Sequence, residues 1–344
     1  MRAVVYTESG PPSVLQVVGR DATEPGPGEV RIRVVRSGVN PTDWKVRQGA
    51  VPGQGLAFPE VVPDQDGSGV VDAVGPGVDR LAVGDRVWVM LAAHQRPTGT
   101  AQELTVLPQD RVFPLPEGAG FDLGAALGVP AVTAHRALTT SENGPDRLSP
   151  GALSDMTVLV AGGAGAVGNA AIQLAAWAGA RVISTVSSDR KAELATAAGA
   201  HHVVDYTEGD TAARIRKLAP DGVDIVVEVA PAQNLALDLA VVRLRGTIAV
   251  YANNGGDQVT LNVRETFSLN VRLQFVLLYT LGEAALRAAA EDVHSAITAG
   301  AFGVGEEHGV PLHHFPLERT ADAHQAVEEG IVGKVLVDVA DPLP

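Results

Sequence analysis

The glycines between residues 162 and 168 have the spacing of a phosphate-binding turn. In the stretch TVLVAGGAGAVG (157–168), β-branched residues give way to glycines, and an alanine-rich helical pattern follows at 169–178. Gly163, Gly165 and Gly168 fit G-x-G-x-x-G between a predicted strand and a predicted helix, the context that this motif requires. Such glycines allow a tight turn, close approach of the backbone to a pyrophosphate, and close packing of helix on strand.

An ordinary glycine-rich turn is the alternative to a binding site, but the flanking strand and helix favour a dinucleotide. The N–H groups and the dipole at the start of a helix favour phosphate charge. The residues expected to form the pyrophosphate site are Gly162, Gly163, Gly165, Ala166, Val167 and Gly168.

The residues after the second predicted strand indicate which dinucleotide is bound. An NAD-binding fold usually has Asp or Glu at this place for the ribose hydroxyls, whereas this chain has Ser187 and Ser188. Small hydroxyl side chains leave room for a 2′-phosphate, and Arg190 or Lys191 can neutralise it. Asp189 is an argument for NAD, unless it only begins the next helix. We therefore predict NADPH as the coenzyme.

Composition excludes several classes of function. A chain of 344 residues with a net charge of −14 suggests about two domains and argues against nucleic acid or an anionic membrane surface as a partner. The N-terminus has no apolar signal core, and no stretch has the length of a membrane span, so we expect a soluble, cytoplasmic protein. The absence of cysteine excludes disulfides and thiolate metal sites.

The pattern of elements predicts an α/β fold with a doubly wound parallel sheet and a second, β-rich part. Residues 1–127 contain short β-like runs separated by glycine and proline, which favours a barrel-like unit. Strands and helices then alternate over 128–275, as in a parallel sheet covered on both faces. A long helical pattern ends near residue 299, and short strands close the chain.

Several strings in order along the chain resemble the medium-chain dehydrogenase/reductase superfamily. They include VNPTDWKVRQG (39–49), PDQDGSGVVDAVGPGV (63–78), LGVPAVTAHRAL (127–138) and GKVLV (333–337), besides the glycine-rich turn. They are most similar to its zinc-independent quinone oxidoreductase branch, the ζ-crystallin-like proteins. The resemblance implies a GroES-like catalytic domain of residues 1–127 and 276–344 and a Rossmann dinucleotide-binding domain of residues 128–275.

One departure from the wider superfamily bears on the reaction. Zinc-dependent members hold the metal with Cys and with a His in a G-H-E motif, whereas Gln65 takes the His place here and no Cys exists. Without zinc to polarise an alkoxide, we expect no metal and reduction of an electron-poor acceptor. The resemblance implies NADPH-dependent reduction of quinones or other conjugated carbonyls. NPTDWK is also similar to enoyl reductases of the superfamily, so an enoyl-thioester reductase and a non-catalytic NADPH-binding protein stay as alternatives.

Hydride addition to such an acceptor builds negative charge on oxygen, so the site needs a hydrogen-bond donor. From their place in the NPTDWK segment, Asn40, Asp43, Lys45 and Arg47 are the polar candidates for the cleft, and Asn40, Lys45 and Arg47 are the catalytic ones. Lys45 or Arg47 would stabilise the oxyanion or bind a coenzyme phosphate. Structural roles in a turn or in solvent are the alternatives. The further coenzyme contacts that the resemblance implies are Ser187, Ser188, Lys191 and Tyr206 around the 2′-phosphate and adenine, and Thr133, Asn253, Leu277 and Tyr279 towards the nicotinamide.

The apolar segment VRLQFVLLY (271–279) is predicted to be the sixth strand of the sheet and therefore an edge strand. An unpaired edge invites pairing with another chain. In the family that the chain resembles, two subunits join through this edge, which implies a homodimer.

Overall fold

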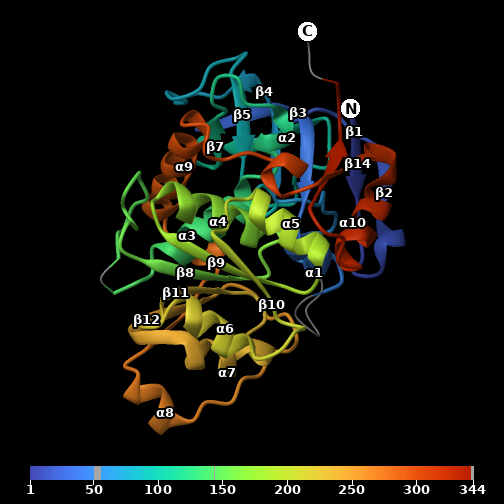
Figure 1. Ribbon diagram of the computed structural model, residues 1–344. Coiled ribbons are helices and arrows are strands. Elements are labelled where there is room, and N and C mark those ends of the chain that lie inside the picture. The colour runs from blue at the N-terminus through green and yellow to red at the C-terminus, as the bar shows by residue number, and fades with distance from the viewer. Residues whose placement is uncertain (50–55, 143, 342–344) are drawn as a thin grey trace. The chain divides into compact units, whose positions relative to one another are not determined.

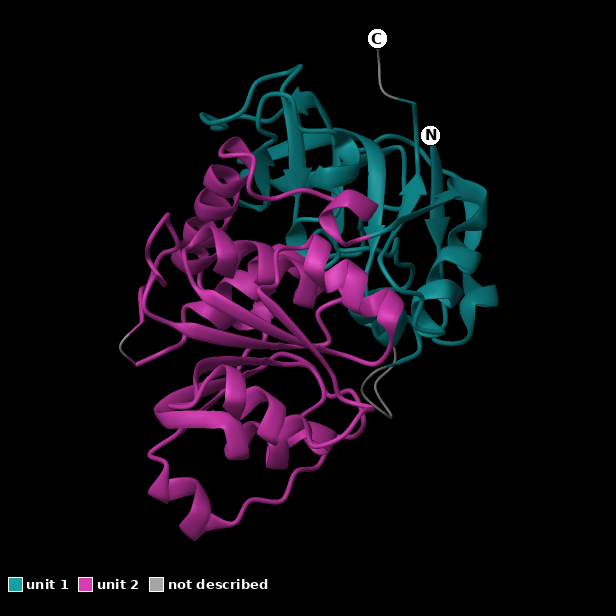
Figure 2. Ribbon diagram, viewed as in Figure 1, with its two compact units in different colours: residues 1–129, 311–344 teal, residues 130–310 magenta. Residues whose placement is uncertain are grey.

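The computed structural model describes residues 1–49, 56–142 and 144–341. Two compact units share the chain (Figure 2): unit 1 comprises Met1–Val129 and Pro311–Pro344, and unit 2 comprises Pro130–Val310. Over the residues that are described, no helix has both the length and the apolar character that crossing a membrane would require.

Unit 1 is built on a seven-stranded sheet. The strands run in the order β14 (Leu312–Pro316), β15 (Lys334–Asp338), β3 (Glu29–Val39), β4 (Asp66–Val74), β5 (Arg86–Val89) and β7 (Val112–Pro114), with β6 (Leu104–Pro108) also paired to β3. All pairs are antiparallel except β14 with β15. Val30, Ile32 and Val34 alternate along β3 into the core, which is the period of a half-buried strand.

The rest of unit 1 consists of a small hairpin and short helices. Strands β1 (Arg2–Val5) and β2 (Gln16–Gly19) pair antiparallel. The helices are α1 (Pro41–Arg47), α2 (Phe121–Gly124) and α10 (Thr320–Glu328). Helix α1 packs on α10, and this contact joins the N-terminal and C-terminal parts of the unit.

Unit 2 contains a six-stranded, all-parallel sheet. The strands are β10 (His202–Asp205), β9 (Arg181–Val186), β8 (Thr157–Ala161), β11 (Val223–Glu228), β12 (Val242–Val250) and β13 (Arg272–Phe275), in that order. Numbered along the chain, this is the 3-2-1-4-5-6 order of a doubly wound dinucleotide-binding sheet. The predicted parallel sheet is therefore present.

Helices cover both faces of the sheet in unit 2. Figure 1 shows α4 (Ala166–Trp177) and α5 (Asp189–Ala197) on one face and α6 (Thr211–Leu218) and α7 (Pro231–Val241) on the other. The sheet is apolar on both sides: Leu159, Ile183, Val226 and Ile248 pair in one row on one face, and Val158, Val182 and Ile225 pair in the next row on the other, all almost without exposure. Such near-continuous burial is typical of parallel strands.

The sixth strand is shorter than the sequence predicts. Strand β13 ends at Phe275, and a 3-10 turn, η3 (Leu278–Thr280), replaces the second half of the apolar run. Thr280 closes this turn, because its N–H and its hydroxyl both donate to Leu277 O. An apolar run without a turn signal could not reveal this local hydrogen bonding.

Residues 276–310 pack with unit 2, whereas the domain boundary expected from the sequence places them in the catalytic domain. Helix α9 (Glu283–Thr298) carries the buried Asp292, whose carboxylate lies 2.7 Å from both His135 Nε2 and Leu148 N and also accepts from Arg147. Through the Asp292 carboxylate, residues 276–310 therefore contact His135, Arg147 and Leu148 near the start of unit 2.

Candidate active site

The glycine-rich turn of unit 2 has the close contacts that its motif predicts. A Cβ on Gly163 would lie 2.0 Å from Ser184 Oγ, and one on Gly168 would lie 2.4 Å from Gly162 O. Gly162 has a φ of +68°, which favours glycine. Side chains at Gly163 and Gly168 would therefore push helix α4 away from the sheet, whereas one at Gly162 would strain the backbone.

Gly165, the middle glycine of the motif, has a different environment. Gly165 is exposed and precedes α4 as its N-cap, and a Cβ there would meet only Gly162 O at 3.5 Å. No side chain caps the helix at this position. The first N–H groups of α4, including those of Ala166, Val167 and Gly168, have no acceptor within the helix and can bind an anion.

The turn lies where an open α/β sheet binds its ligands. It follows β8, and β8 pairs with both β9 and β11, so the strand order reverses at this strand. Ligands of such sheets bind at the carboxyl ends of the strands at this switch point. Asn253 follows β12 and Leu277 follows β13, so both belong to the same carboxyl edge. Tyr279 lies in η3 beyond it.

Thr133 comes from a different kind of element. It lies on α3 (Gly128–Leu138), one turn from the helix start, and only 6% of it is exposed. No sheet edge supplies it, so its expected place beside a nicotinamide rests on the sequence resemblance alone.

The predicted 2′-phosphate residues gather after β9 and β10. Lys191 Nζ donates to Ser187 Oγ at 2.9 Å, and Ser188 Oγ caps α5 by accepting from Lys191 N at 3.4 Å. Tyr206 N donates to Val186 O at 3.0 Å, which places the half-exposed tyrosine beside the end of β9. The structure thus brings together Ser187, Ser188, Lys191 and Tyr206.

The two neighbouring cations differ in their partners. Arg190 forms ion pairs with Glu193 and Glu306. Lys191 has no carboxylate partner within the described ranges, and it contacts only the hydroxyl of Ser187 and the helix cap. Asp189 is exposed at the first position of α5, where a carboxylate is favoured by the helix dipole. Lys191 is therefore the cation with charge available for a phosphate.

Asn40 belongs to a buried polar cluster in unit 1. Its Nδ2 donates to Asp66 Oδ2 at 2.8 Å, and Lys334 Nζ donates to its Oδ1 at 2.7 Å. Lys334 lies 3.6 Å from Asp66, and all three residues are 2% exposed or less. Burial raises the pKa of Asp66 to about 6, against the opposing effects of Lys334 and Asn40, and burial lowers the pKa of Lys334. The Asn40 side chain therefore forms hydrogen bonds to both partners of the Lys334–Asp66 ion pair.

Asp43, a polar candidate of the NPTDWK segment, and Asp64 extend this cluster into a network that the sequence did not reveal. Asp43 accepts from Asn40 N at 2.7 Å and from Gln65 N at 3.1 Å. Asp64, whose φ is +78°, bonds to Ser37 Oγ at 2.8 Å and to His324 Nε2 at 2.9 Å. Burial, followed by the charges of Asp64 and Asp66, raises the pKa of Asp43 well above its usual value.

Arg47 does not have the surroundings of an oxyanion donor. The residue is fully buried, its NH2 group forms a 2.9 Å ion pair with Glu328 on α10, and its NH1 group donates to Gly10 O. These contacts give Arg47 a structural role in joining α1 to α10, and the catalytic role expected for it stays a prediction. Lys45 is half-buried, with Nζ 5.8 Å from the centre of the Trp44 ring.

The donor set around Gln65 does not fit a zinc ion. Both polar atoms of the Asn40 amide are already engaged, and the ammonium group of Lys334 lies at the same carboxylate that a metal would need. No cluster of three His, Cys, Asp or Glu side chains suited to a metal occurs in the described part of the chain. Zinc prefers thiolate and imidazole ligands, which are absent from this segment.

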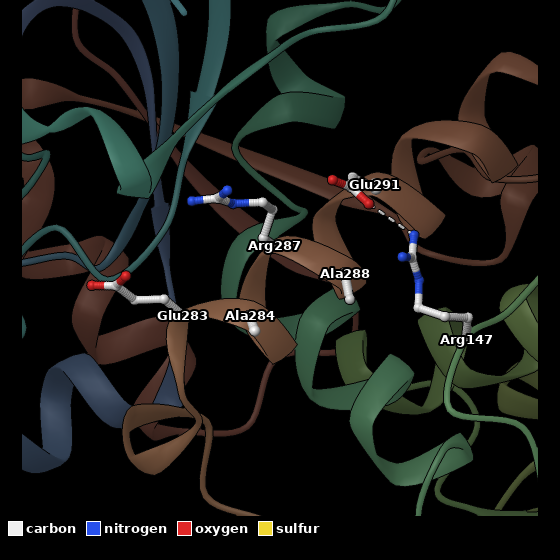
Figure 3. Close-up of a pocket in the computed structure, with 6 residues that line it drawn as sticks. All are labelled: Arg147, Glu283, Ala284, Arg287, Ala288 and Glu291. Carbon is white, nitrogen blue, oxygen red and sulfur yellow. Dashed lines mark hydrogen bonds and ion pairs between the residues drawn. The ribbon is translucent and has the colours of Figure 1, made fainter.

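A separate pocket of about 380 Å³ opens on α9 of unit 2. Figure 3 shows its lining, in which Arg147 is paired with Glu291. The lining residues are Arg147, Glu283, Ala284, Arg287, Ala288 and Glu291. None of the residues predicted for the site lines this pocket.

Comparison with protein families matches both parts of the chain. Residues 26–117 match the alcohol dehydrogenase GroES-like domain, and residues 166–295 match the family described as zinc-binding dehydrogenase. These matches confirm the predicted fold class.

Individual relatives cover almost the whole chain. Quinone oxidoreductase of Rattus norvegicus is 31% identical over 98% of this chain and 97% of its own. A crystal structure described as an NAD-dependent alcohol dehydrogenase is 31% identical with a TM-score of 0.86 and covers 99% of this chain and 100% of that chain. A mycobacterial protein complexed with NADPH is 31% identical with a TM-score of 0.81, over 98% of this chain and 99% of that chain.

Proposed function

We propose that this chain, which belongs to the quinone oxidoreductase branch of the medium-chain dehydrogenase/reductase superfamily, is an NADPH-dependent reductase of quinones or other conjugated carbonyls. The chain is an oxidoreductase by family. The preference for NADPH, the acceptor class and the site residues are the parts that we propose.

The observation that carries the proposal is the cluster after β9. Two serines stand where an acidic residue would hold the ribose hydroxyls of NAD, and Lys191 beside them has no carboxylate partner among the described residues. A 2′-phosphate would accept from Lys191 and from the two hydroxyls by charge-assisted hydrogen bonds. Tyr206, half-exposed beside Val186, supplies an aromatic surface for the adenine.

The glycine-rich turn would hold the pyrophosphate. Gly163 and Gly168 allow α4 to begin close to the sheet, and the exposed Gly165 leaves the approach to the first N–H groups of α4 open. Asn253, Leu277 and Tyr279 follow strands of the same sheet and are proposed to orient the nicotinamide, together with Thr133. When bound, the coenzyme supplies a hydride.

The chain's own contribution to the chemistry is binding and orientation. When hydride adds to a conjugated carbonyl, the electron pair moves to the carbonyl oxygen, which then takes a proton. Hydrogen-bond donors placed at that oxygen lower the barrier. The buried ion pair of Lys334 and Asp66 holds Asn40 and therefore fixes the N-cap of α1, a short helix whose last turn carries Lys45. We assign Lys45 to the surroundings of the acceptor on this basis.

Coenzyme oxidation tests the proposal directly. The purified chain should oxidise NADPH with a panel of 1,4-quinones and short enones, and it should oxidise NADH more slowly at equal concentration. Turnover with enoyl thioesters alone would favour the enoyl reductase. Binding of NADPH without turnover of any acceptor would leave a non-catalytic NADPH-binding protein.

A further inference from the structure

The side-chain amide of Gln65 has no hydrogen-bond partner although it is almost fully buried. The residue is 6% exposed, and its Oε1 atom is buried with no donor within reach. Within the described residues, Nε2 of Gln65 donates no hydrogen bond either. An unpaired buried amide costs about 1–3 kcal/mol, so each one calls for an explanation, and a catalytic role is one of them.

The backbone around this amide is fixed on every side. Gln65 N donates to Asp43 at 3.1 Å, and Gln65 O accepts from Ala92 N at 3.0 Å. The preceding residue, Asp64, is held with a positive φ by His324 and Ser37. The following residue, Asp66, is held by Asn40 and by Val129 N at 2.8 Å. Asp64, Gln65 and Asp66 are thus buried in succession. Of these three side chains, only that of Gln65 has no hydrogen-bond partner among the described residues.

Another buried glutamine of unit 1 differs from Gln65 at the amide nitrogen. Gln102 is 1% exposed, and its Nε2 donates to Gly99 O at 3.0 Å, although its Oε1, like that of Gln65, has no partner among the described residues. The protein thus holds the amide nitrogen of Gln102, whereas that of Gln65 has no acceptor within the described ranges. A positive backbone φ at a non-glycine residue, as at Asp64, is uncommon, and such residues cluster at functional sites.

We infer that Gln65 is a catalytic residue whose amide binds the carbonyl oxygen of the acceptor. The inference rests on the proposed function and names the group that meets the reacting oxygen. The amide N–H donates a hydrogen bond to that oxygen and keeps its proton. Hydride adds to the conjugated carbon, the electron pair moves to the oxygen, and the resulting enolate or hydroquinone anion takes its proton from water. Asp43 and Asp64 are positioning residues, because they act on Gln65 only through its backbone.

Replacing Gln65 by Met keeps the length of the side chain and removes the amide. We expect kcat/KM for a 1,4-quinone to fall on the order of 100-fold, as when one oxyanion donor is lost. Coenzyme affinity, measured by fluorescence titration, should stay the same. The melting temperature should stay the same or rise, because an unpaired buried amide is removed. Gln65→Glu, which keeps an acceptor and loses the donor, should also lose activity.

The matched control is Gln102→Met, which should lower the melting temperature and leave kcat/KM within about threefold of wild type, because Gln102 bonds only to the protein. A Gln65→Met variant with near-normal kcat/KM would overturn the inference while leaving the proposed function intact. If the melting temperature of Gln65→Met fell so far that unfolding explained its lost activity, Gln65 would have a structural role instead. A wild-type chain that reduces no quinone or enone with either coenzyme would overturn the proposed function and, with it, this inference.

Discussion

Glu228 and Asp238 are two carboxyl groups that interact in the interior of unit 2, where the charge of Glu228 acts on Asp238. Glu228 ends β11 and is 0% exposed, and Asp238 lies on α7 and is 1% exposed. Glu228 Oε1 accepts from Ala230 N and from Asn234 Nδ2, whereas Glu228 Oε2 and Asp238 Oδ2 have no donor among the described residues. Two interacting buried carboxyl groups are not both charged, and the two donors at Glu228 favour the charge there and the proton on Asp238.

The free energy of unfolding should therefore still change with pH at values above those at which carboxyl groups usually titrate. Burial, followed by the charge of Glu228, raises the pKa of Asp238 well above its usual value. The folded state then binds this proton more tightly than the unfolded state. The stabilisation is present at low pH and is lost as the pH rises through the folded pKa, by up to about 1.4 kcal/mol per pH unit for one proton.

The change that tests this is Asp238→Asn, whose amide donates to Glu228 at every pH. Urea unfolding of this variant should show a smaller loss of stability than wild type between about pH 5 and about pH 8. The exposed Asp155→Asn in the same unit serves as the control and should follow wild type. Parallel pH profiles for all three proteins would mean that no proton is shared.

Lys191→Ala should weaken NADPH more than NADH. The loss for NADPH should be about 1–3 kcal/mol if Lys191 makes a charge-assisted hydrogen bond to the 2′-phosphate. Arg190→Ala is the matched control, since it removes the same charge one residue away from a side chain already paired with Glu193 and Glu306. Titration of both coenzymes measures the effect. Equal losses for the two coenzymes would place Lys191 away from the phosphate.

The middle and last glycines of the motif should respond differently to a methyl group. Gly168→Ala should destabilise the coenzyme-free chain by about 1–3 kcal/mol, because the new Cβ would lie 2.4 Å from Gly162 O. Gly165→Ala should unfold in urea much as wild type does, since its Cβ meets only one atom at 3.5 Å. Its coenzyme affinity should nevertheless fall, because the methyl group blocks the approach to α4. Normal coenzyme binding by Gly165→Ala would contradict the assigned pyrophosphate site.

We expect the chain to form a homodimer through β13. Val276 N donates inward to Val250 O at 2.7 Å, so the backbone of Phe275 faces away from the sheet, where it can pair with another chain. Light scattering should give twice the mass of one chain, and Phe275→Asp should shift the mass towards one chain. Val83→Asp is the control, because Val83 and Phe275 are both 63% exposed. A wild-type mass of one chain would refute the dimer.

The purified protein should contain no stoichiometric zinc although one part of it matches a family described as zinc-binding. The chain has no cysteine, and the ammonium of Lys334 pairs with Asp66 beside Gln65. Elemental analysis should find well below one zinc per chain, and a chelator should leave activity unchanged. One zinc per chain that is lost together with activity would disprove this.

Features with local causes could be predicted from the sequence. The glycine spacing predicted the turn after β8, and alternating strands and helices predicted the parallel sheet, because both depend on residues adjacent in the chain. The surroundings of Asn40 could not be predicted, since Lys334 reaches it from 294 residues away. The ion pair of Arg47 could not be predicted for the same reason: its partner Glu328 lies on α10, 281 residues further on.

The unpaired amide of Gln65 shows another limit of sequence reading. Its residue type was visible, but whether a buried polar atom has a partner depends on every side chain around it. The early end of β13 is similar, because the competing turn at Thr280 depends on two hydrogen bonds to one carbonyl.

The hydroxyl and ammonium groups after β9 all lie within five consecutive residues, from Ser187 to Lys191. Their backbone is set by β9 and by the first turn of α5, and of these side chains Ser188 caps the helix. We therefore expect coenzyme preference in this protein to be modular. Transplanting a single pentapeptide from an NAD-specific relative should exchange the preference while leaving the acceptor range unaltered.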